Sequence, residues 1–177
     1  IDRLGWGLED GAPTPARLRV LYPRAYWEEV RRVSRDSGLD PYLVLSVARQ
    51  ESTFRASVSS SAGARGVMQL MPSTATWLAS KDPLVPAECA SNLEDPASSL
   101  RLGACYLARM LRENDGNVVR ALAAYNAGPG NVRKWLRSQG HQDTEQFVET
   151  IPYGETRHYV KRVLGNYAAY RSLYREE

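Results

Sequence analysis

The segment PYLVLSVARQES, residues 41–52, combines a strongly apolar helical pattern with a carboxylate near its end. Read as a helix over 41–51, it places Val44, Val47 and Ala48 on the same face as Glu51, because they precede the glutamate by seven, four and three positions. A carboxylate against apolar neighbours loses hydration, which raises its pKa and lets it hold a proton near neutral pH. The segment therefore indicates a general acid. The alternative is a glutamate whose side chain reaches water at the helix end.

Helical patterns continue over most of the chain from Tyr22 onward, and no alternating strand pattern stands out. Capping signals support them: Asp40 precedes a proline at a first helical position, and Gly38 and Gly116 follow expected helix ends. We therefore predict a compact all-α domain whose functional groups project from helix ends and loops into a central groove. The expected helices cover residues 25–37, 41–51, 73–80, 97–113, 117–126, 130–138 and 155–174, with a short turn near 144–149.

Residues 1–21 differ from the rest of the chain because glycine and proline recur in them. We interpret this stretch as an irregular lead-in or linker, and residues 22–177 as one domain large enough to bury a core. The sequence begins at Ile1 without an initiating methionine or a signal-peptide pattern, so we expect a processed product or an excised domain.

The composition is that of an ordinary globular protein, with 43% hydrophobic residues, 24% charged residues and a net charge of +3. The longest basic runs are two residues, as at Arg31-Arg32, and no basic stripe carries interleaved aromatic residues. We therefore expect no nucleic-acid partner. Since no apolar run approaches the roughly 18 residues that a membrane span requires, we also expect a protein that does not span a membrane.

The cysteines Cys89 and Cys105 have a spacing that matches no zinc or redox motif. Cys89 falls in an expected loop and Cys105 on an expected helix, so a disulfide and two unpaired thiols both stay open. The two histidines, His141 and His158, lie far apart without ligand-type neighbours, and we expect no metal site.

A serine- and glycine-rich loop follows Glu51 and leads into VMQLMP, residues 67–72. Its glycines allow backbone to approach a ligand closely, its serines and Gln69 offer hydrogen-bonding groups, and Met71 offers a deformable apolar surface. This combination suits a sugar-binding groove. The ordinary alternative is a solvated loop that ends at the helix-starting Pro72.

A further segment, AYNAGPG at residues 124–130, ends a helix on which Val118, Ala121 and Leu122 share a face with Tyr125. Tyr125 therefore points inward, with a phenol that needs a hydrogen-bond partner. It is either a groove residue or a core tyrosine satisfied by a backbone carbonyl.

Four segments in this order closely resemble the catalytic domain of the soluble lytic transglycosylases of bacteria. They are Glu51-Ser52, GVMQLMP at 66–72, AYNAG at 124–128 and IPYGETRHYV at 151–160, and the resemblance spans residues 22–174. It implies a lysozyme-like α-helical fold with a central glycan-binding groove, and peptidoglycan glycan strands as the substrate. It also implies a periplasmic or cell-envelope location. We expect a monomer that uses no cofactor.

The resemblance further implies roles for individual residues. Glu51 matches the single catalytic acid/base, and Ser60, nine residues later, matches a serine that orients the N-acetyl group of the substrate. Gln69 and Met71 match residues that line the groove. The sequence departs from the family pattern at Val67, where leucine is commoner.

Three matches lie in the second half of the chain. Tyr125 matches a tyrosine that hydrogen-bonds near the acid, and Glu155 matches a second carboxylate that binds sugar. Asn126 and Gly128 look structural and are expected to shape the turn between two helices.

The implied reaction differs from ordinary glycoside hydrolysis, which uses two carboxylates about 5–5.5 Å or about 6.5–9.5 Å apart. Here only Glu51 has a strong claim to catalysis. One acid suffices if the N-acetyl oxygen of the substrate supports the oxocarbenium-like centre. Glu51 would protonate the leaving oxygen and then deprotonate the C6 hydroxyl of muramic acid, which closes a 1,6-anhydro ring without consuming water.

Two other functions stay open. A goose-type lysozyme shares the single glutamate and a turn like AYNAG, and it would give a hydrolysed product. An inactive peptidoglycan-binding module is the other alternative, although the retained Glu51-Ser52 argues against it.

Overall fold

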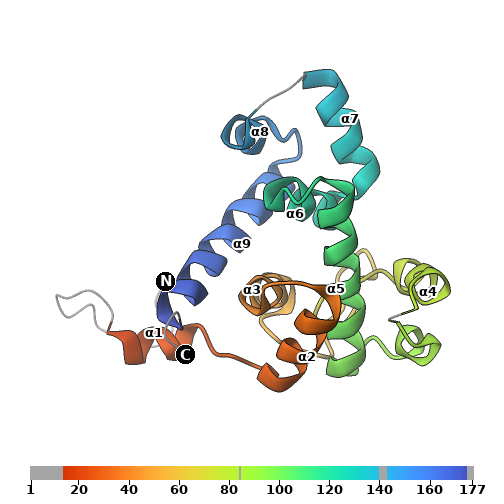
Figure 1. Cartoon of the computed structure of the whole chain (residues 1–177), viewed down its shortest axis with the longest axis vertical. Coiled ribbons are helices and arrows are strands. Elements are labelled where there is room, and N and C mark those ends of the chain that lie inside the picture. Colours follow the sequence, from red (N-terminus) through yellow and green to blue (C-terminus); the bar gives the residue numbers. More distant parts are fainter. Residues whose placement is uncertain (1–13, 84, 140–142, 175–177) are drawn as a thin grey trace.

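The computed structural model describes residues 14–83, 85–139 and 143–174, and in these ranges the regular elements are all helices (Figure 1). The expected all-α class is confirmed. In chain order the elements are α1 Pro15–Leu21, α2 Trp27–Ser37, α3 Pro41–Ser52, α4 Pro72–Lys81, the 3-10 helix η1 Ala87–Ser91, α5 Pro96–Glu113, α6 Val118–Ala127, α7 Pro129–Gln139, α8 Thr144–Thr150 and α9 Gly154–Leu173.

Helices α2 to α7 and α9 lie where the sequence predicts helices, with ends that differ from the expected ones by at most two residues, as at the start of α2. Where a short turn is expected near 144–149, the chain forms the seven-residue helix α8. The interpretation of residues 1–21 as irregular is wrong for its last part, because Pro15–Leu21 form α1. The side chain of Thr14 accepts a hydrogen bond from the Arg17 amide, and Pro15 begins the helix, so capping overrides the Gly/Pro-rich composition. Residues 1–13 lie outside the described residues.

The other correction concerns Cys89, which lies in η1 rather than in a loop. Cys105 lies on α5 as expected, and both cysteines are buried and unpaired. The structure therefore favours two free thiols over a disulfide.

Helix α3 is fixed at both ends by local chemistry. Asp40 caps its first turn, because the Oδ1 atom accepts from the Tyr42 amide at 2.8 Å, and Pro41 supplies a preset φ at the first helical position. Thr53 ends the helix in a left-handed conformation, with φ of 51°. Glu51 therefore lies in the last turn of a helix whose start and end are both determined locally.

The same Asp40 also joins α3 to the C-terminal helix. Its Oδ2 atom accepts from the hydroxyl of Tyr167 on α9 at 2.7 Å. Tyr42 of α3 donates to the carbonyl of Tyr174 at 3.1 Å, just beyond the end of α9. These bonds hold α9 along α3, and so they place the first half of α9 beside Glu51.

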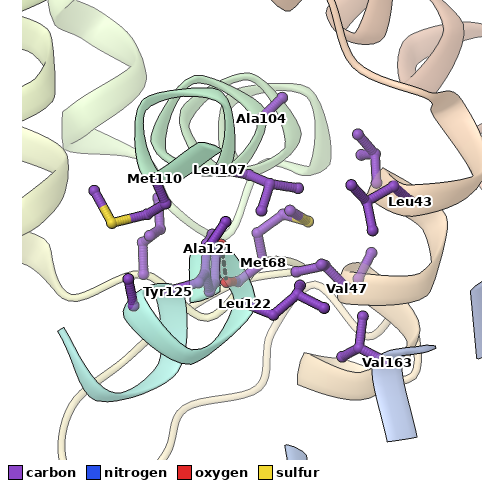
Figure 2. Packing of buried hydrophobic residues seen from close by; sticks show 14 of the residues in the cluster. Leu43, Val47, Met68, Ala104, Leu107, Met110, Ala121, Leu122, Tyr125 and Val163 are labelled. Atoms are coloured by element: carbon purple, nitrogen blue, oxygen red, sulfur yellow. Dashed lines mark hydrogen bonds between the residues drawn. The ribbon is translucent and has the colours of Figure 1, made fainter. Parts of the chain in front are cut away.

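The main core lies between α3, α5, α6 and α9. Figure 2 shows Leu43 and Val47 of α3, Leu107 of α5, Leu122 of α6 and Val163 of α9 pointing toward one another, and all are buried. Burial of one such aliphatic side chain stabilises a fold by about 1.5–3 kcal/mol.

Met68 is a core residue that comes from a loop rather than from a helix. It is fully buried among these helices (Figure 2), and Gly103 of α5 leaves room for it, since a Cβ atom there would lie 2.5 Å from the Met68 side chain. The loop that follows Glu51 is therefore anchored in the core by its own side chain.

No helix in the described part of the chain is long and apolar enough to cross a membrane.

Candidate active site

Glu51 combines partial burial with a side-chain hydrogen bond from α9. Its helical neighbours Val44, Val47 and Ala48 are fully buried, as the periodicity predicts. The hydroxyl of Tyr159 on α9 donates to Oε1 of Glu51 at 2.8 Å. Burial raises the pKa of Glu51 to about 7, the hydrogen bond from Tyr159 opposes this rise, and the negative charge of Glu155 adds to it. Glu51 can therefore hold or release a proton near neutral pH.

A pocket of about 400 Å³ opens beside this carboxylate, and all the residues predicted for the site line it. The structure thus brings together side chains from α3, the following loop, α6 and the start of α9. These residues are Glu51, Ser60, Gln69, Met71, Tyr125 and Glu155.

Two further pockets extend this one. A pocket of about 380 Å³ shares Glu51, Asn126 and Glu155 with it and continues along α9. On the other side, a pocket of about 500 Å³ shares Thr74 and Tyr106 with it. The three form a groove in which Glu51 has space on both sides, as a polymeric substrate requires.

The loop that carries Ser60 is closed by its own hydrogen bonds. The Ser60 amide donates to the carbonyl of Ala64 at 2.9 Å, and Oγ of Ser60 accepts from the Ala64 amide at 3.0 Å. The hydroxyl proton of Ser60 is not used in these bonds, and the residue is exposed. Ser60 can therefore donate to a ligand in the pocket.

Gln69 stabilises the loop as well as lining the pocket. Its Nε2 atom donates to the carbonyls of Val58 at 2.8 Å and Gly66 at 2.9 Å, which uses both amide hydrogens. Its backbone lies in the left-handed region, with φ of 47°. Its Oε1 atom is the group that remains to accept a hydrogen bond from a ligand.

Tyr125 is a buried tyrosine whose hydroxyl bonds to the loop. It donates to the carbonyl of Met68 at 2.9 Å, the dashed line in Figure 2. Of the two alternatives that the sequence left open, the hydroxyl thus follows the one in which a backbone carbonyl satisfies it. Tyr125 also lines the pocket. Tyr125 thus holds the loop at the acid, while the hydroxyl bonded to the Glu51 carboxylate belongs to Tyr159.

Sequence reasoning missed Tyr159 as a site residue, although it lies within the quoted segment 151–160. A signal was present, since Tyr159 follows Glu155 by four positions and therefore shares its helix face. Burial, together with the negative charge of Glu51, raises the pKa of both Tyr125 and Tyr159 well above the usual value. Both phenols therefore stay protonated and remain donors at neutral pH.

Glu155 is exposed in the first turn of α9 and lines the pockets on both sides of Glu51. Next to it, the hydroxyl of Thr156 donates to Oδ1 of Asn126 at 2.7 Å, which ties the end of α6 to the start of α9. Asn126 therefore has a structural role in joining these two helices, and Glu155 is the exposed carboxylate that a ligand in the pocket can reach.

Met71 is partly exposed, at 39%; it occupies the N-cap position of α4 and lines the pocket. The hydroxyl of Ser52, next to the acid, donates to the carbonyl of Val67 at 2.8 Å. The Met68 amide donates to Oγ of Ser99 on α5 at 3.0 Å. The loop between Glu51 and α4 is therefore held by α3, α5 and α6 together.

No cluster of three or more His, Cys, Asp or Glu side chains that could hold a metal ion occurs in the described ranges. His158 lines the pocket along α9, and His141 lies outside the described residues.

Comparison with known proteins gives matches over almost the whole described chain. The family model described as "Transglycosylase SLT domain" matches residues 29–148, and the one described as "Soluble lytic transglycosylase helical domain" matches residues 150–177. The soluble lytic murein transglycosylase of Salmonella typhimurium is 40% identical over 155 residues, which are 87% of this chain and 24% of that protein. The chain spans about a quarter of the length of such curated relatives.

Solved structures of lytic transglycosylases have the same fold as this chain. The crystal structure of the 70 kDa soluble lytic transglycosylase from Escherichia coli matches with a TM-score of 0.83 at 38% identity, over 88% of this chain and 25% of that one. The lytic transglycosylase Slt from Pseudomonas aeruginosa, solved as an inactive mutant, matches with a TM-score of 0.79 at 39% identity and the same coverage. Since the first family match covers more than half of the residues, this chain belongs to the Transglycosylase SLT domain family.

Proposed function

We propose that this chain is the catalytic domain of a peptidoglycan lytic transglycosylase. It cleaves the β-1,4 bond between N-acetylmuramic acid and N-acetylglucosamine, and Glu51 is its acid and base. The observation that carries the proposal is the Glu51 carboxyl group, with a pKa raised to about 7, at the point where two groove pockets meet. The relatives named soluble lytic murein transglycosylases support it.

In the first step Glu51 donates its proton to the glycosidic oxygen. A pKa near 7 keeps a large fraction of the carboxyl protonated at neutral pH, which a general acid requires. The hydrogen bond from Tyr159 to Oε1 fixes the orientation of the carboxyl group. The leaving sugar departs while the N-acetyl oxygen of the muramic acid residue supports the positive charge at C1.

In the second step the Glu51 carboxylate takes the proton of the C6 hydroxyl of muramic acid, whose oxygen then bonds to C1. The proton given to the leaving sugar is thereby replaced, and a 1,6-anhydro ring forms without water. Ser60 orients the N-acetyl group, Gln69 and Met71 line the sugar site, and Glu155 accepts hydrogen bonds from sugar hydroxyls. Tyr125 acts through the loop that it holds.

The Pseudomonas aeruginosa relative supports an essential glutamate, since its structure is that of an inactive Glu-to-Gln mutant. From the proposed substrate we infer that the protein acts in the periplasm or elsewhere in the cell envelope. We also propose that it acts as a monomer, because Glu51 and the groove residues around it form the site without a gap that a second copy would have to fill.

A goose-type lysozyme reaction is the alternative, and the product separates the two. Purified peptidoglycan is digested, and the released fragments are reduced with borohydride and analysed by mass spectrometry. Transglycosylation gives 1,6-anhydro ends that borohydride does not reduce. Hydrolysis gives reducible ends that are about 18 Da heavier before borohydride treatment, by the addition of one water, and about 20 Da heavier after it. Mainly reducible muramic ends would overturn the proposal, and release of no fragments would favour the inactive binding module.

A further inference from the structure

A further pocket lies beyond the groove, where α3 and α9 pack together near the end of α1. It measures about 540 Å³, and it shares Gln50 and Arg162 with the pocket that continues along α9 from Glu51. Figure 1 shows α9 passing α3 and ending close to α1, so these helices meet on this face. We call this cavity the Arg49 pocket. Its lining includes Tyr22, Arg49, Gln50, Thr53, Arg162 and Asn166.

Arg49 is held in place by stacking on an aromatic ring. Its guanidinium carbon lies 4.5 Å from the centroid of the Tyr22 ring. Stacking of this kind occupies one flat face of the guanidinium and leaves the N–H donors at its edge available. Arg49 forms no ion pair with any residue in the described ranges. The fold therefore orients this charge without neutralising it.

Arg162 supplies a second guanidinium group from α9. It is exposed, and it has neither a hydrogen-bond partner nor an ion-pair partner in the part of the chain that the structure describes. None of the described residues that line the pocket is acidic, whereas Gln50 and Asn166 add amide groups. Two positive charges that face one cavity repel each other, and a bound anion would remove this repulsion.

Thr53 adds a hydroxyl group to the same lining, in an unusual backbone conformation. It ends α3 with φ of 51°, in the left-handed region, and its side chain is exposed. Glycine is the usual residue at such a helix end, and a β-branched residue there is an outlier. Strained residues of this kind cluster at sites that bind ligands. The side chain of Thr53 therefore indicates a role in the pocket, since glycine would suit the backbone better.

The donor groups of the pocket match a phosphate group better than a carboxylate. A carboxylate carries one charge, and the fork of a single guanidinium satisfies it. A phosphate group carries a charge of about −1.5 to −2 at neutral pH and offers three acceptor oxygens, which suits two guanidinium groups with a hydroxyl beside them. A neutral sugar ring needs no arginine. Of these ligands, the phosphate group fits the lining best.

We propose that the Arg49 pocket binds a phosphate group, either as free phosphate or as the phosphomonoester headgroup of a lipid. Arg49 and Arg162 neutralise its charge, and the hydroxyl of Thr53 donates to one of its oxygens. The inference goes beyond the proposed function and does not depend on it, because binding at this pocket requires no cleavage of a glycan.

The first test measures binding of inorganic phosphate and of acetate by calorimetry near neutral pH, at one fixed ionic strength. Wild type should bind phosphate more tightly than acetate. Arg49→Gln should weaken phosphate binding about five- to tenfold, because charged hydrogen bonds to a partly exposed group are lost. Arg49→Lys keeps the charge but not the fork of donors, so its affinity should fall between those of wild type and Arg49→Gln.

Arg35→Gln is the matched control, because it removes an exposed arginine of α2 that does not line the pocket. It should bind phosphate as wild type does. Arg162→Gln is the second variant, since Arg162 has no stacking contact whose loss could unfold the protein, and it should weaken binding as Arg49→Gln does. Equal affinity of wild type for phosphate and acetate would overturn the inference, and so would equal losses in Arg35→Gln and Arg49→Gln.

Thr53→Gly separates a binding role from a structural one. Glycine relieves the left-handed backbone, so this variant should have a higher melting temperature than wild type. It should nevertheless bind phosphate at least twofold more weakly, because the hydroxyl is gone. A higher melting temperature with unchanged affinity would contradict the role given to Thr53.

Vesicles distinguish the two sources of the phosphate group. Wild type and Arg49→Gln are sedimented with vesicles of phosphatidylcholine, with and without phosphatidic acid. Binding that requires both phosphatidic acid and Arg49 would support a lipid headgroup as the ligand. Calorimetric binding of phosphate without binding to vesicles would support free phosphate. If wild type binds neither inorganic phosphate nor the phosphatidic acid vesicles, the inference is wrong.

Discussion

The hydroxyl of Tyr159 donates to Oε1 of Glu51 at 2.8 Å across 108 residues of sequence. It is the side-chain contact that joins the acid on α3 to the helix that also carries Glu155. The bond stabilises the charged form of Glu51, whereas burial and the charge of Glu155 stabilise the neutral form. The pKa of Glu51 near 7 therefore results from three opposing effects, and a change in the burial of Glu51, in Tyr159 or in Glu155 would shift it.

Removal of this hydroxyl should move the pH profile. In Tyr159→Phe the charged form of Glu51 loses a donor, so its pKa rises further and the alkaline limb of kcat/KM moves to higher pH. The maximal rate should fall, because the carboxyl group is less firmly oriented. Activity measured from pH 5 to 9 on soluble glycan checks both effects. An alkaline limb at unchanged or lower pH would contradict the role given to this bond.

Glu51→Gln should abolish cleavage, since the amide has nearly the same shape but can neither give nor take the proton. General acid–base catalysis contributes about 10²–10⁴-fold, and one residue serves both steps here, so a loss near or beyond the upper end is expected. Release of fragments from purified peptidoglycan is the measurement. A variant that kept more than about a tenth of wild-type turnover would remove Glu51 from the mechanism.

The same variant should change how stability depends on pH. Glu51 has a pKa near 7 when folded and near 4.5 as a reference, so the folded state binds its proton more tightly. Stability from this group is full below about pH 4.5 and is lost as pH rises to about 7. At about 1.4 kcal/mol per pKa unit the loss is on the order of 3 kcal/mol. Urea unfolding of wild type and Glu51→Gln at pH 4.5 and 8 should therefore favour the variant more at pH 8, and an equal difference at both pH values would contradict the shift.

Local sequence pattern was enough to predict α2 to α7, α9 and the apolar side of Glu51, because those features repeat within a few residues along one helix. The pattern could not predict α1, whose residues are not buried and whose start depends on the cap at Thr14. It also missed η1, because a five-residue 3-10 helix has no periodicity to detect.

Contacts between distant helices were beyond the sequence pattern. The partner of Glu51 depends on how α9 lies along α3, which Asp40 and Tyr167 determine through a bond between the two helices. The orientation of the Gln69 amide could not be predicted either. It depends on a left-handed backbone conformation at Gln69, and glutamine in a sequence does not indicate such a conformation.

Tyr125→Phe should lower the free energy of unfolding more than it lowers the rate of cleavage. The hydroxyl donates to the carbonyl of Met68 rather than to the acid, so its loss leaves a buried acceptor without that donor. About 1–3 kcal/mol of unfolding free energy should be lost. The pH profile of the folded protein should stay close to that of wild type, unlike that of Tyr159→Phe. Chemical unfolding together with the pH profile tests this, and a shifted alkaline limb without a loss of stability would point to direct contact with the acid.

Gly66→Ala should destabilise the protein and the loop at the site, with Gly63→Ala as the matched control. Both glycines have a left-handed φ, +80° and +92°, so both changes carry a backbone cost of about 1–2 kcal/mol. The two positions differ in the room that they leave for a Cβ atom. A Cβ atom at Gly66 would overlap the carbonyl oxygen of Leu93 and lie 2.7 Å from Oγ of Ser99, whereas one at Gly63 meets nothing within 4 Å.

The Ser99 hydroxyl that this Cβ atom would displace also accepts from the Met68 amide, so the damage should spread to the loop beside Glu51. Overpacking costs about 1–3 kcal/mol, and Gly66→Ala should lose at least that much more stability than Gly63→Ala in urea unfolding. Its activity should fall as well, because Gln69 and Met71 of the same loop line the pocket beside Glu51. Equal urea unfolding curves for the two variants would contradict this prediction. They would show that the backbone near Leu93 moves aside at little cost and that the close approach of Gly66 to Leu93 does not fix the loop.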